Sequence, residues 1–262
     1  MADNGPVSGD PLEIVVLAVA GVVAGAVNAV AGGGSLITFP VLIATGLPAL
    51  TANITNTIAQ TPGYVSGAYG YRRMLVGQGA RIRRFVPLAL LGGALGIAAL
   101  KLGSADTFRT IVPVLILGAC ALLAAGPRLR ARIGERPEDG SASGRSVLLL
   151  DVAVVGVGVY VAYFGAAAGV MLLAVLSVLI TDTLQRLNAL NRFLVLVVNA
   201  PTAVVLGILG PVDWTAVAVL APTTLVGGSL GVVVARRLSD RVLRAAVITL
   251  GVGVATYLLA TA

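Results

Sequence analysis

The stretch PLALLGGALG at positions 87–96 recurs later in the chain as PTTLVGGSLG at positions 222–231. Other residues align at the same ungapped offset of 135 positions (222 − 87): Asn53 with Asn188, Asn56 with Asn191, and Gly34 with Gly169. In an apolar chain, matches of Ala, Val or Leu mean little, whereas matched asparagines, prolines and paired glycines rarely arise by chance. The chain is therefore predicted to be an internal duplication.

The composition around this repeat is that of a membrane protein. Of the 262 residues, 58% are hydrophobic and 11% are charged, whereas a soluble domain carries about 25% charged residues. A bilayer core needs about 20 helical residues, so the two shortest apolar segments are predicted to be half-helices, tilted pieces shielded by protein, or re-entrant. The apolar segments lie near 12–31, 35–46, 51–71, 85–101, 108–125, 146–165, 170–181, 184–208, 213–235 and 242–261. The fold class predicted is an all-α polytopic membrane protein, multi-pass in the cell membrane.

A charged linker divides the two copies. Residues 127–145 read PRLRARIGERPEDGSASGR, a composition that cannot form a packed core. We therefore expect a first transmembrane repeat over 1–126, a cytoplasmic linker over 127–145 and a second transmembrane repeat over 146–262. The first residues are acidic and lack the basic start of a signal peptide, so the first apolar run is expected to stay in the membrane.

The arginines indicate how the two copies are oriented. They gather in the loops 72–84, 126–145 and 236–241, and basic loops face the cytoplasm. If all ten segments cross and the N-terminus lies outside, the three loops share the cytoplasmic side. If the short segments do not cross, the last cluster falls on the opposite side. The charges therefore favour two inverted five-segment repeats, each with a broken or half-helix, an architecture that recurs in secondary transporters.

Several classes of function are excluded by what the chain lacks. The net charge of +7 is spread over short clusters without interleaved aromatic residues, so no nucleic-acid partner is expected. The chain has one cysteine, Cys120, and no histidine, so no metal, haem or other cofactor is expected. Without a carboxylate pair at helical spacing, the usual acid–base groups of an enzyme are missing. A homo-oligomer remains open.

The first candidate for binding a substrate is the turn Gly32, Gly33, Gly34 and Ser35. Glycines allow a sharp turn, and the N-terminus of the following half-helix would direct N–H groups and a positive dipole end at an anion. The alternative is a close helix–helix contact through small residues, and the motif alone does not separate the two. The second copy has Ala166 to Gly169 here, a less open turn.

The second candidate is a polar face on one helix and its counterpart in the other copy. Asn53, Asn56 and Gln60 follow one another at spacings of three and four, with Thr57 beside them, so they share a face. The other copy supplies Asn188, Asn191 and Arg192. Arg192 lies about eight residues, or roughly 12 Å, into its span. A planar guanidinium suits an oxyanion; the alternative is that it pairs with a carbonyl or with Asp182 while the asparagines bridge helices. We favour the substrate interpretation.

Carboxylates are scarce in the apolar part of the chain. Asp151 and Asp182 could carry a coupling proton, although the sequence gives no direct sign of it. Asp151 follows a basic stretch, which favours a charge-paired position at the membrane surface.

The stretch AVNAVAGGGSLITFPVL at positions 26–42, followed by Gly46 and by ANITN at 52–56, resembles the sulfite exporter TauE/SafE family, also called the toluene sulfonate uptake permease family. The resemblance extends over essentially the whole chain, since that family is itself an internal duplication of this length. The chain departs from the pattern at Ala166 to Gly169 and at Val175, where the second proline is missing. The resemblance implies passage of sulfur-containing oxyanions such as sulfite or organosulfonates.

The function predicted is therefore that of a secondary transporter, which moves a small sulfur-containing oxyanion across the inner membrane by alternating access. Its partners would be the anion and the lipid bilayer. The alternatives are an anion channel and a transporter of a different small organic anion.

Overall fold

A computed structural model describes residues 10–30, 32–133, 144–166 and 168–234, together with a few positions between 248 and 259. Within these ranges the chain is all-helical, as predicted, with no strand. The helices are α1 (Pro11–Val30), α2 (Ser35–Ala44), α3 (Ala49–Gly70), the 3-10 helix η1 (Arg72–Leu75), α4 (Gly79–Leu102), α5 (Ala105–Ile133), α6 (Gly144–Tyr163), α7 (Ala168–Leu179), α8 (Leu184–Leu209) and α9 (Trp214–Val234). Most of the expected last segment, 242–261, lies outside the described residues, as do the arginines at 236–244.

The two short segments fold as short helices. α2 has 10 residues and α7 has 12, which is about half to three fifths of the roughly 20 residues that a bilayer core needs. α2 begins directly after the Gly32–Gly34 turn and ends before Gly46, whose φ of 91° terminates it, because a left-handed residue cannot continue an α-helix. α2 thus has glycine at both ends, whereas α7 has glycine only at its start, at Gly165 and Gly169.

Three helices differ in extent from the sequence expectation. α4 begins at Gly79, so Arg81, Arg83 and Arg84 belong to its first turns rather than to a loop. α5 continues to Ile133 and α6 begins at Gly144, so both ends of the expected linker are helical. Arg, Leu and Ala are good helix formers, which explains why an apolar helix extends into basic sequence.

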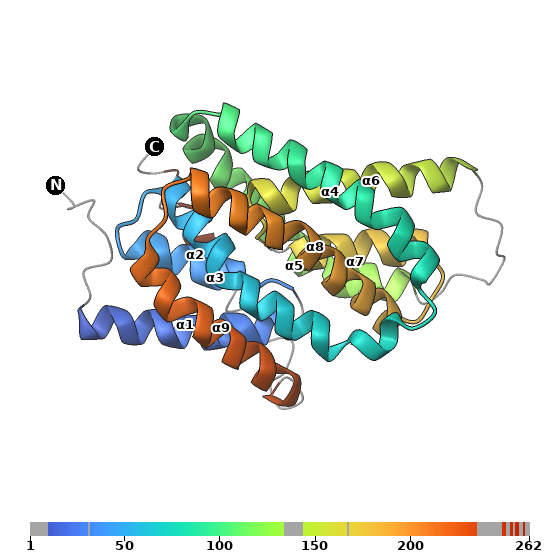
Figure 1. Ribbon diagram of the computed structural model, residues 1–262, viewed down its shortest axis with the longest axis horizontal. Helices are drawn as coiled ribbons and strands as arrows, with labels where there is room; N and C mark the ends of the chain where they lie inside the picture. The colour runs from blue at the N-terminus through green and yellow to red at the C-terminus, as the bar shows by residue number, and fades with distance from the viewer. Residues whose placement is uncertain are drawn as a thin grey trace.

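The long helices form three layers (Figure 1). α1 lies along α9 at one side, α4 lies along α6 at the other, and α3 and α8 pack between them. α3 also packs on α9 and α8 on α4. α2 and α7 are tucked against the central helices, and α5 contacts α7 and α3. The core of the molecule is therefore the α3–α8 layer, where the predicted polar faces lie.

The outer pairs are held together by the glycines of the repeated stretch. A Cβ at Gly92 of α4 would overlap the carbonyl oxygen of Val155 on α6, and a Cβ at Gly227 of α9 would overlap that of Val22 on α1. Their neighbours Gly93 and Gly228 face the central layer, against Val198 of α8 and Ser66 of α3. Small residues allow such close backbone approach in membrane helices. The aligned glycines thus make corresponding contacts in the two copies.

In the part of the chain that the structure describes, three helices are long and apolar enough to cross a membrane by length and composition, over Pro11–Ala29, Gly79–Leu102 and Gln185–Leu209. α3 has 22 residues but carries many polar side chains, which lower its hydropathy. Because α3 packs between α8 and α9, those side chains have protein partners instead of lipid, as a polar residue in a membrane requires.

Corresponding helices of the two copies run in opposite directions in Figure 1. α1 runs from left to right and α6 from right to left; α3 and α8 are likewise opposed, as are α4 and α9. The pairing of α1 with α9 corresponds to that of α6 with α4.

Candidate functional site

The two glycine turns of the chain touch each other at the centre of the molecule. Gly32, with a φ of +78°, lies against Gly169, the first turn of α7: a Cβ added to Gly32 would lie 2.7 Å from the Gly169 Cα, and one added to Gly169 would lie 2.8 Å from the Gly32 Cα. Ordinary carbon contacts are about 3.5–4.0 Å. Neither position therefore has room for a side chain, and this glycine contact brings the two copies together.

A chain of buried side-chain hydrogen bonds begins at the first turn. The N–H of Gly34, which caps α2, donates to Asn28 Oδ1 at 2.8 Å. Asn28 Nδ2 donates to Gln60 Oε1 at 2.9 Å, and Gln60 Nε2 donates to Thr38 Oγ1 at 2.7 Å. Thr38 then donates to Asn56 Oδ1 at 2.5 Å. Because the Gly34 N–H can act only as a donor, it fixes the orientation of both amides that follow.

Arg192 reaches the end of α1, just before this turn, from the other copy. Its guanidinium donates to the backbone oxygen of Asn28, and its Nε donates to Asn188 Oδ1 at 3.3 Å. The side chain passes α3 at Gly67, where a Cβ would lie 3.9 Å from Arg192 Cδ. Both of these acceptors are neutral oxygens. We call this set the polar cluster: Asn28, Thr38, Asn56, Gln60, Asn188 and Arg192.

Two further predicted residues bind the second glycine turn instead. Asn53 Nδ2 donates to the backbone oxygen of Tyr163 at 3.0 Å, and Asn191 Nδ2 donates to that of Gly169 at 2.9 Å. Their Oδ1 atoms are buried without a hydrogen-bond partner among the described residues. The hydroxyl of Thr57 forms its hydrogen bond within α3, because its Oγ1 donates to the backbone oxygen of Asn53. These three residues therefore position helices around the polar cluster.

The polar cluster is closed off from solvent in this conformation. Arg192 is 4% exposed, Asn188 8%, and Asn28 1%. Ser35 is also buried, with its Oγ 3.5 Å from the hydroxyl of Tyr64. A ligand could reach these groups only after the helices around them move.

The two candidate carboxylates lie away from the polar cluster, in ion pairs with arginines at the start of α4. Asp151 accepts two hydrogen bonds from Arg84, at 2.9 and 2.7 Å. Asp182 pairs with Arg81, and Arg186 Nε lies 3.2 Å from the same carboxylate. We call Arg81, Asp182 and Arg186 the ionic latch, because it joins the start of α4 to the turn between α7 and α8.

Hydrogen bonds within the ionic latch keep Asp182 ionised. Burial by itself raises the pKa of this carboxyl, but hydrogen bonds from Arg81, from the Thr183 N–H and from Arg186 outweigh it and lower the pKa below the usual value. A coupling proton needs a group that titrates near the working pH. A proton-coupling role for Asp151 or Asp182 stays a prediction, and their geometry is that of structural ion pairs.

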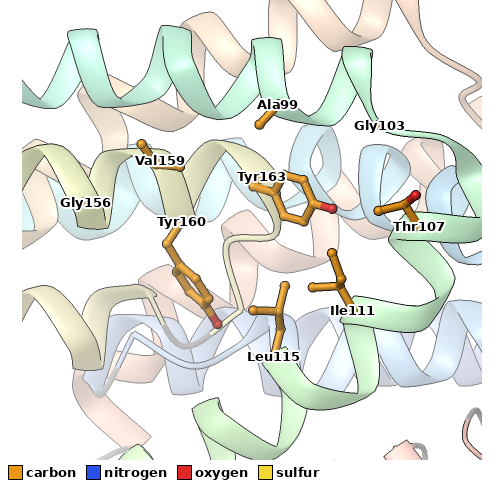
Figure 2. Close-up of a pocket in the computed structure, with 9 residues that line it drawn as sticks. All are labelled: Ala99, Gly103, Thr107, Ile111, Leu115, Gly156, Val159, Tyr160 and Tyr163. Carbon is orange, nitrogen blue, oxygen red and sulfur yellow. The ribbon is translucent and has the colours of Figure 1, made fainter.

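A separate pocket of about 430 Å³ opens between α4, α5 and α6 (Figure 2). The rings of Tyr160 and Tyr163 project from α6 toward Ile111 and Leu115 of α5. The other residues that line the pocket are Ala99, Gly103, Thr107, Gly156 and Val159. Tyr160 donates its hydroxyl to the backbone oxygen of Ala166 at 2.6 Å. With this apolar lining and no charged side chain, the pocket offers an anion little, and it is distinct from the polar cluster.

Sequence reasoning missed two members of the polar cluster, Asn28 and Thr38, and it also missed Tyr64, whose hydroxyl lies 3.5 Å from Ser35 Oγ. Tyr64 follows Gln60 by four residues and so continues the predicted face of α3, a signal that was available. Thr38 lies one turn after Gly34. Asn28 is a single polar residue in an apolar run, and a single residue has no periodicity from which its role could be predicted.

Apolar helices that enclose a buried arginine and a network of amides are typical of membrane transport proteins. The family model of the sulfite exporter TauE/SafE family matches residues 17–258. Because that match covers nearly the whole chain, the protein belongs to this family, which is a family of transporters. No curated protein and no solved structure matches the chain.

Proposed function

We propose that the protein is a secondary transporter that moves a small sulfur-containing oxyanion, such as sulfite or an organosulfonate, by alternating access. The observation that carries this proposal is the buried guanidinium of Arg192, which comes from one copy and bonds the backbone oxygen of Asn28, near the end of α1 and just before the glycine turn of the other copy. A buried charge inside a membrane is costly and marks a functional site by default. The family match supports sulfur oxyanions as the substrate class.

In this mechanism Arg192 neutralises the anion and offers it a planar pair of donors. Asn56, Gln60 and Asn188 contribute amide donors, and the first turn of α2 contributes backbone N–H groups and the positive end of its dipole. Asn53 and Asn191 keep the second glycine turn in place, because both donate to its backbone. The substrate then lies between the two copies, where a change in their relative position alters every contact.

The opposed directions of corresponding helices support inverted repeats, as alternating access commonly requires. With its N-terminus outside, the protein would have the ionic latch at the cytoplasmic side. Thr55 accepts a hydrogen bond from the N–H of Asp213 at 2.9 Å, and this contact joins α3 to the start of α9 at the other end. Gln78, the repeat counterpart of Asp213, joins the start of α4 to α8 through a 2.9 Å hydrogen bond to the backbone oxygen of Arg186. Each end thus has a corresponding contact that could open in turn.

The burial of the polar cluster favours a carrier over an anion channel. A channel that conducts needs a continuous wet path, whereas the described donors are enclosed by packed helices. A carrier passes through a closed state of this kind between its two open states. The family is one of transporters, and we propose no catalytic role.

The test is flux in proteoliposomes loaded with sulfite or with a simple sulfonate. Arg192→Gln should lower uptake and anion affinity about 10- to 150-fold, the range expected for losing a hydrogen bond to a charged group. Arg192→Lys should retain part of the affinity, since it keeps the charge but not the planar fork. Arg83→Gln, which removes an exposed arginine of α4, is the matched control and should leave flux unchanged.

Two results would refute this function. The substrate claim fails if neither sulfite nor sulfonates cross or compete in the wild-type protein. The assignment of Arg192 fails if folded Arg192→Gln binds the anion as tightly as the wild type. Uptake that never saturates and shows no counter-flow would favour the channel.

A further inference from the structure

Asn28 accepts hydrogen bonds from two of the donors that the proposed site would offer to an anion, the Gly34 N–H and the Arg192 guanidinium. Its side-chain oxygen accepts the Gly34 N–H at 2.8 Å, and its backbone oxygen accepts the guanidinium of Arg192. The residue is 1% exposed and lies in the last turns of α1. The two oxygens of Asn28 therefore accept one hydrogen bond from the backbone at the start of α2 and one from the guanidinium of the other copy.

The packing around Gly34 leaves no room beside this arrangement. A Cβ at Gly34 would overlap the backbone oxygen of Ala24 and would lie 2.8 Å from Asn28 Cγ. The amide of Asn28 is held against the turn from its other side by Gln60, through the 2.9 Å hydrogen bond to Gln60 Oε1. An anion oxygen that approaches the Gly34 N–H must therefore displace the oxygen of Asn28.

From these contacts we infer that Asn28 is an internal competitor of the substrate: its side-chain amide oxygen occupies the anion's place at the glycine turn in the closed state. This inference rests on the proposed function and goes beyond it, because it assigns a specificity-determining role to a residue that does not itself neutralise the anion. A neutral amide oxygen satisfies the buried N–H but is a weaker acceptor for these donors than an oxyanion, whose charge-assisted hydrogen bonds are stronger.

This competition selects among ligands. An oxyanion replaces the amide oxygen with a gain in hydrogen-bond strength, whereas a neutral ligand of similar shape gains nothing and remains excluded. In the absence of an anion, Asn28 satisfies the buried Gly34 N–H, which stabilises the closed state of the empty carrier. The inference therefore predicts opposite effects on affinity for two substitutions of the same residue.

Asn28→Ala removes the competing oxygen and leaves the Gly34 N–H in need of an acceptor. Anion affinity should rise about two- to tenfold, the size of one net hydrogen bond, although the protein without anion should unfold at a lower temperature. Asn28→Asp replaces the neutral oxygen with a carboxylate of the same shape beside Arg192. Anion affinity should then fall at least about tenfold, because the like charges repel.

The measurement is the dependence of thermal unfolding on anion concentration, with the purified full chain in detergent and a panel of sulfite, methanesulfonate, sulfate, nitrate and acetate. Asn199 supplies the matched control. It is 4% exposed and donates to the backbone oxygen of Thr57 and to Thr61 Oγ1, away from the turn. Asn199→Ala and Asn199→Asp should change the unfolding temperature but leave the anion dissociation constant within about twofold.

The signs of the two effects decide the inference. A merely structural asparagine would weaken binding in both variants in step with the loss of stability, and that result overturns the proposal. If wild-type protein ignores sulfite and methanesulfonate but responds to another anion, the substrate class of the proposed function fails, while the sign test proceeds with that anion. If no anion in the panel stabilises either the wild type or Asn28→Ala, the competitor role is refuted.

Discussion

The glycine contact avoids two energetic costs, backbone strain and steric overlap between the copies. Alanine substitutions at Gly32, Gly165 and Gly169 measure these costs separately. Gly32 and Gly165 both have positive φ, of 78° and 74°. Gly32 and Gly169 both lie against the other copy, whereas a Cβ at Gly165 would meet only Val161 of the preceding helix α6, with the carbonyl oxygen 3.0 Å away. Gly165→Ala therefore adds backbone strain, Gly169→Ala adds overlap between the copies, and Gly32→Ala adds both.

The size of each effect follows from the geometry. A left-handed alanine costs roughly 1–2 kcal/mol. A methyl group at Gly169 would lie 2.8 Å from the Gly32 Cα, so the turns must separate by about 1 Å to reach ordinary contact, at a cost typical of overpacking, about 1–3 kcal/mol. Gly32→Ala should therefore lower the free energy of unfolding by about 2–5 kcal/mol. The double variant Gly32→Ala with Gly169→Ala should cost less than the sum, because the second methyl enters a gap already opened.

The variants are ranked by thermal unfolding in detergent. The quantity measured is the fraction of protein that stays monodisperse after heating to each temperature. By analogy with soluble proteins of this size, each kcal/mol should lower the midpoint by about 2–4 °C. The reasoning is refuted if Gly32→Ala is no less stable than Gly165→Ala, or if Gly169→Ala matches the wild type. Either result would mean that the two turns do not touch.

Two further predictions concern the ionic latch and the α1–α9 contact. Asp182→Asn should lower the unfolding midpoint at pH 7 by about 2–8 °C, because two partly exposed ion pairs contribute about 1–2 kcal/mol. Since the folded-state pKa of Asp182 is lowered, the stabilisation by the ionic latch is present above the unfolded pKa of about 4 and is lost as pH falls through the folded-state value. A stability difference between Asp182→Asn and wild type that vanishes already near pH 6 would contradict this prediction. Gly25→Ala should strongly destabilise the protein, because its Cβ would overlap the backbone oxygen of Thr224. Gly118→Ala in α5, with open space around it, should stabilise the protein by up to about 1 kcal/mol. Equal unfolding midpoints for the two variants would argue against the tight α1–α9 contact.

The fold could be predicted from the sequence where the signal was distributed over many residues. Membrane character follows from composition, and the short helices α2 and α7 follow from the lengths of their apolar runs. The aligned glycines correctly indicated positions under the same constraint, since Gly92 and Gly227 each face a carbonyl of the partner helix. Helix ends were less accurate, because basic residues that were expected in loops at Arg81 and Arg84 are good helix formers and extend α4.

The site could be predicted only where it follows a helical period. The spacing of Asn56 and Gln60 placed them on one face, and the structure brings both into the polar cluster. The partners across helices could not be predicted, because a sequence does not show which helix lies opposite. The contact of Arg192 with Asn28 joins residues 164 positions apart, and its acceptor is a backbone carbonyl, which the alternative interpretation offered beside Asp182.

The differences between the two copies explain why one anion site, rather than two, is expected at the glycine contact. At the repeat offset, Arg192 corresponds to Thr57, Gln60 to Val195 and Asn28 to Tyr163. The first copy thus retains the glycine turn, Asn56 and Gln60, and the second copy retains Arg192 and Asn188, so the full set of proposed groups comes together only between the two copies. A site divided in this way exists only while the two copies are in contact, and any movement of one copy against the other changes its affinity. That coupling between affinity and relative position is what alternating access requires.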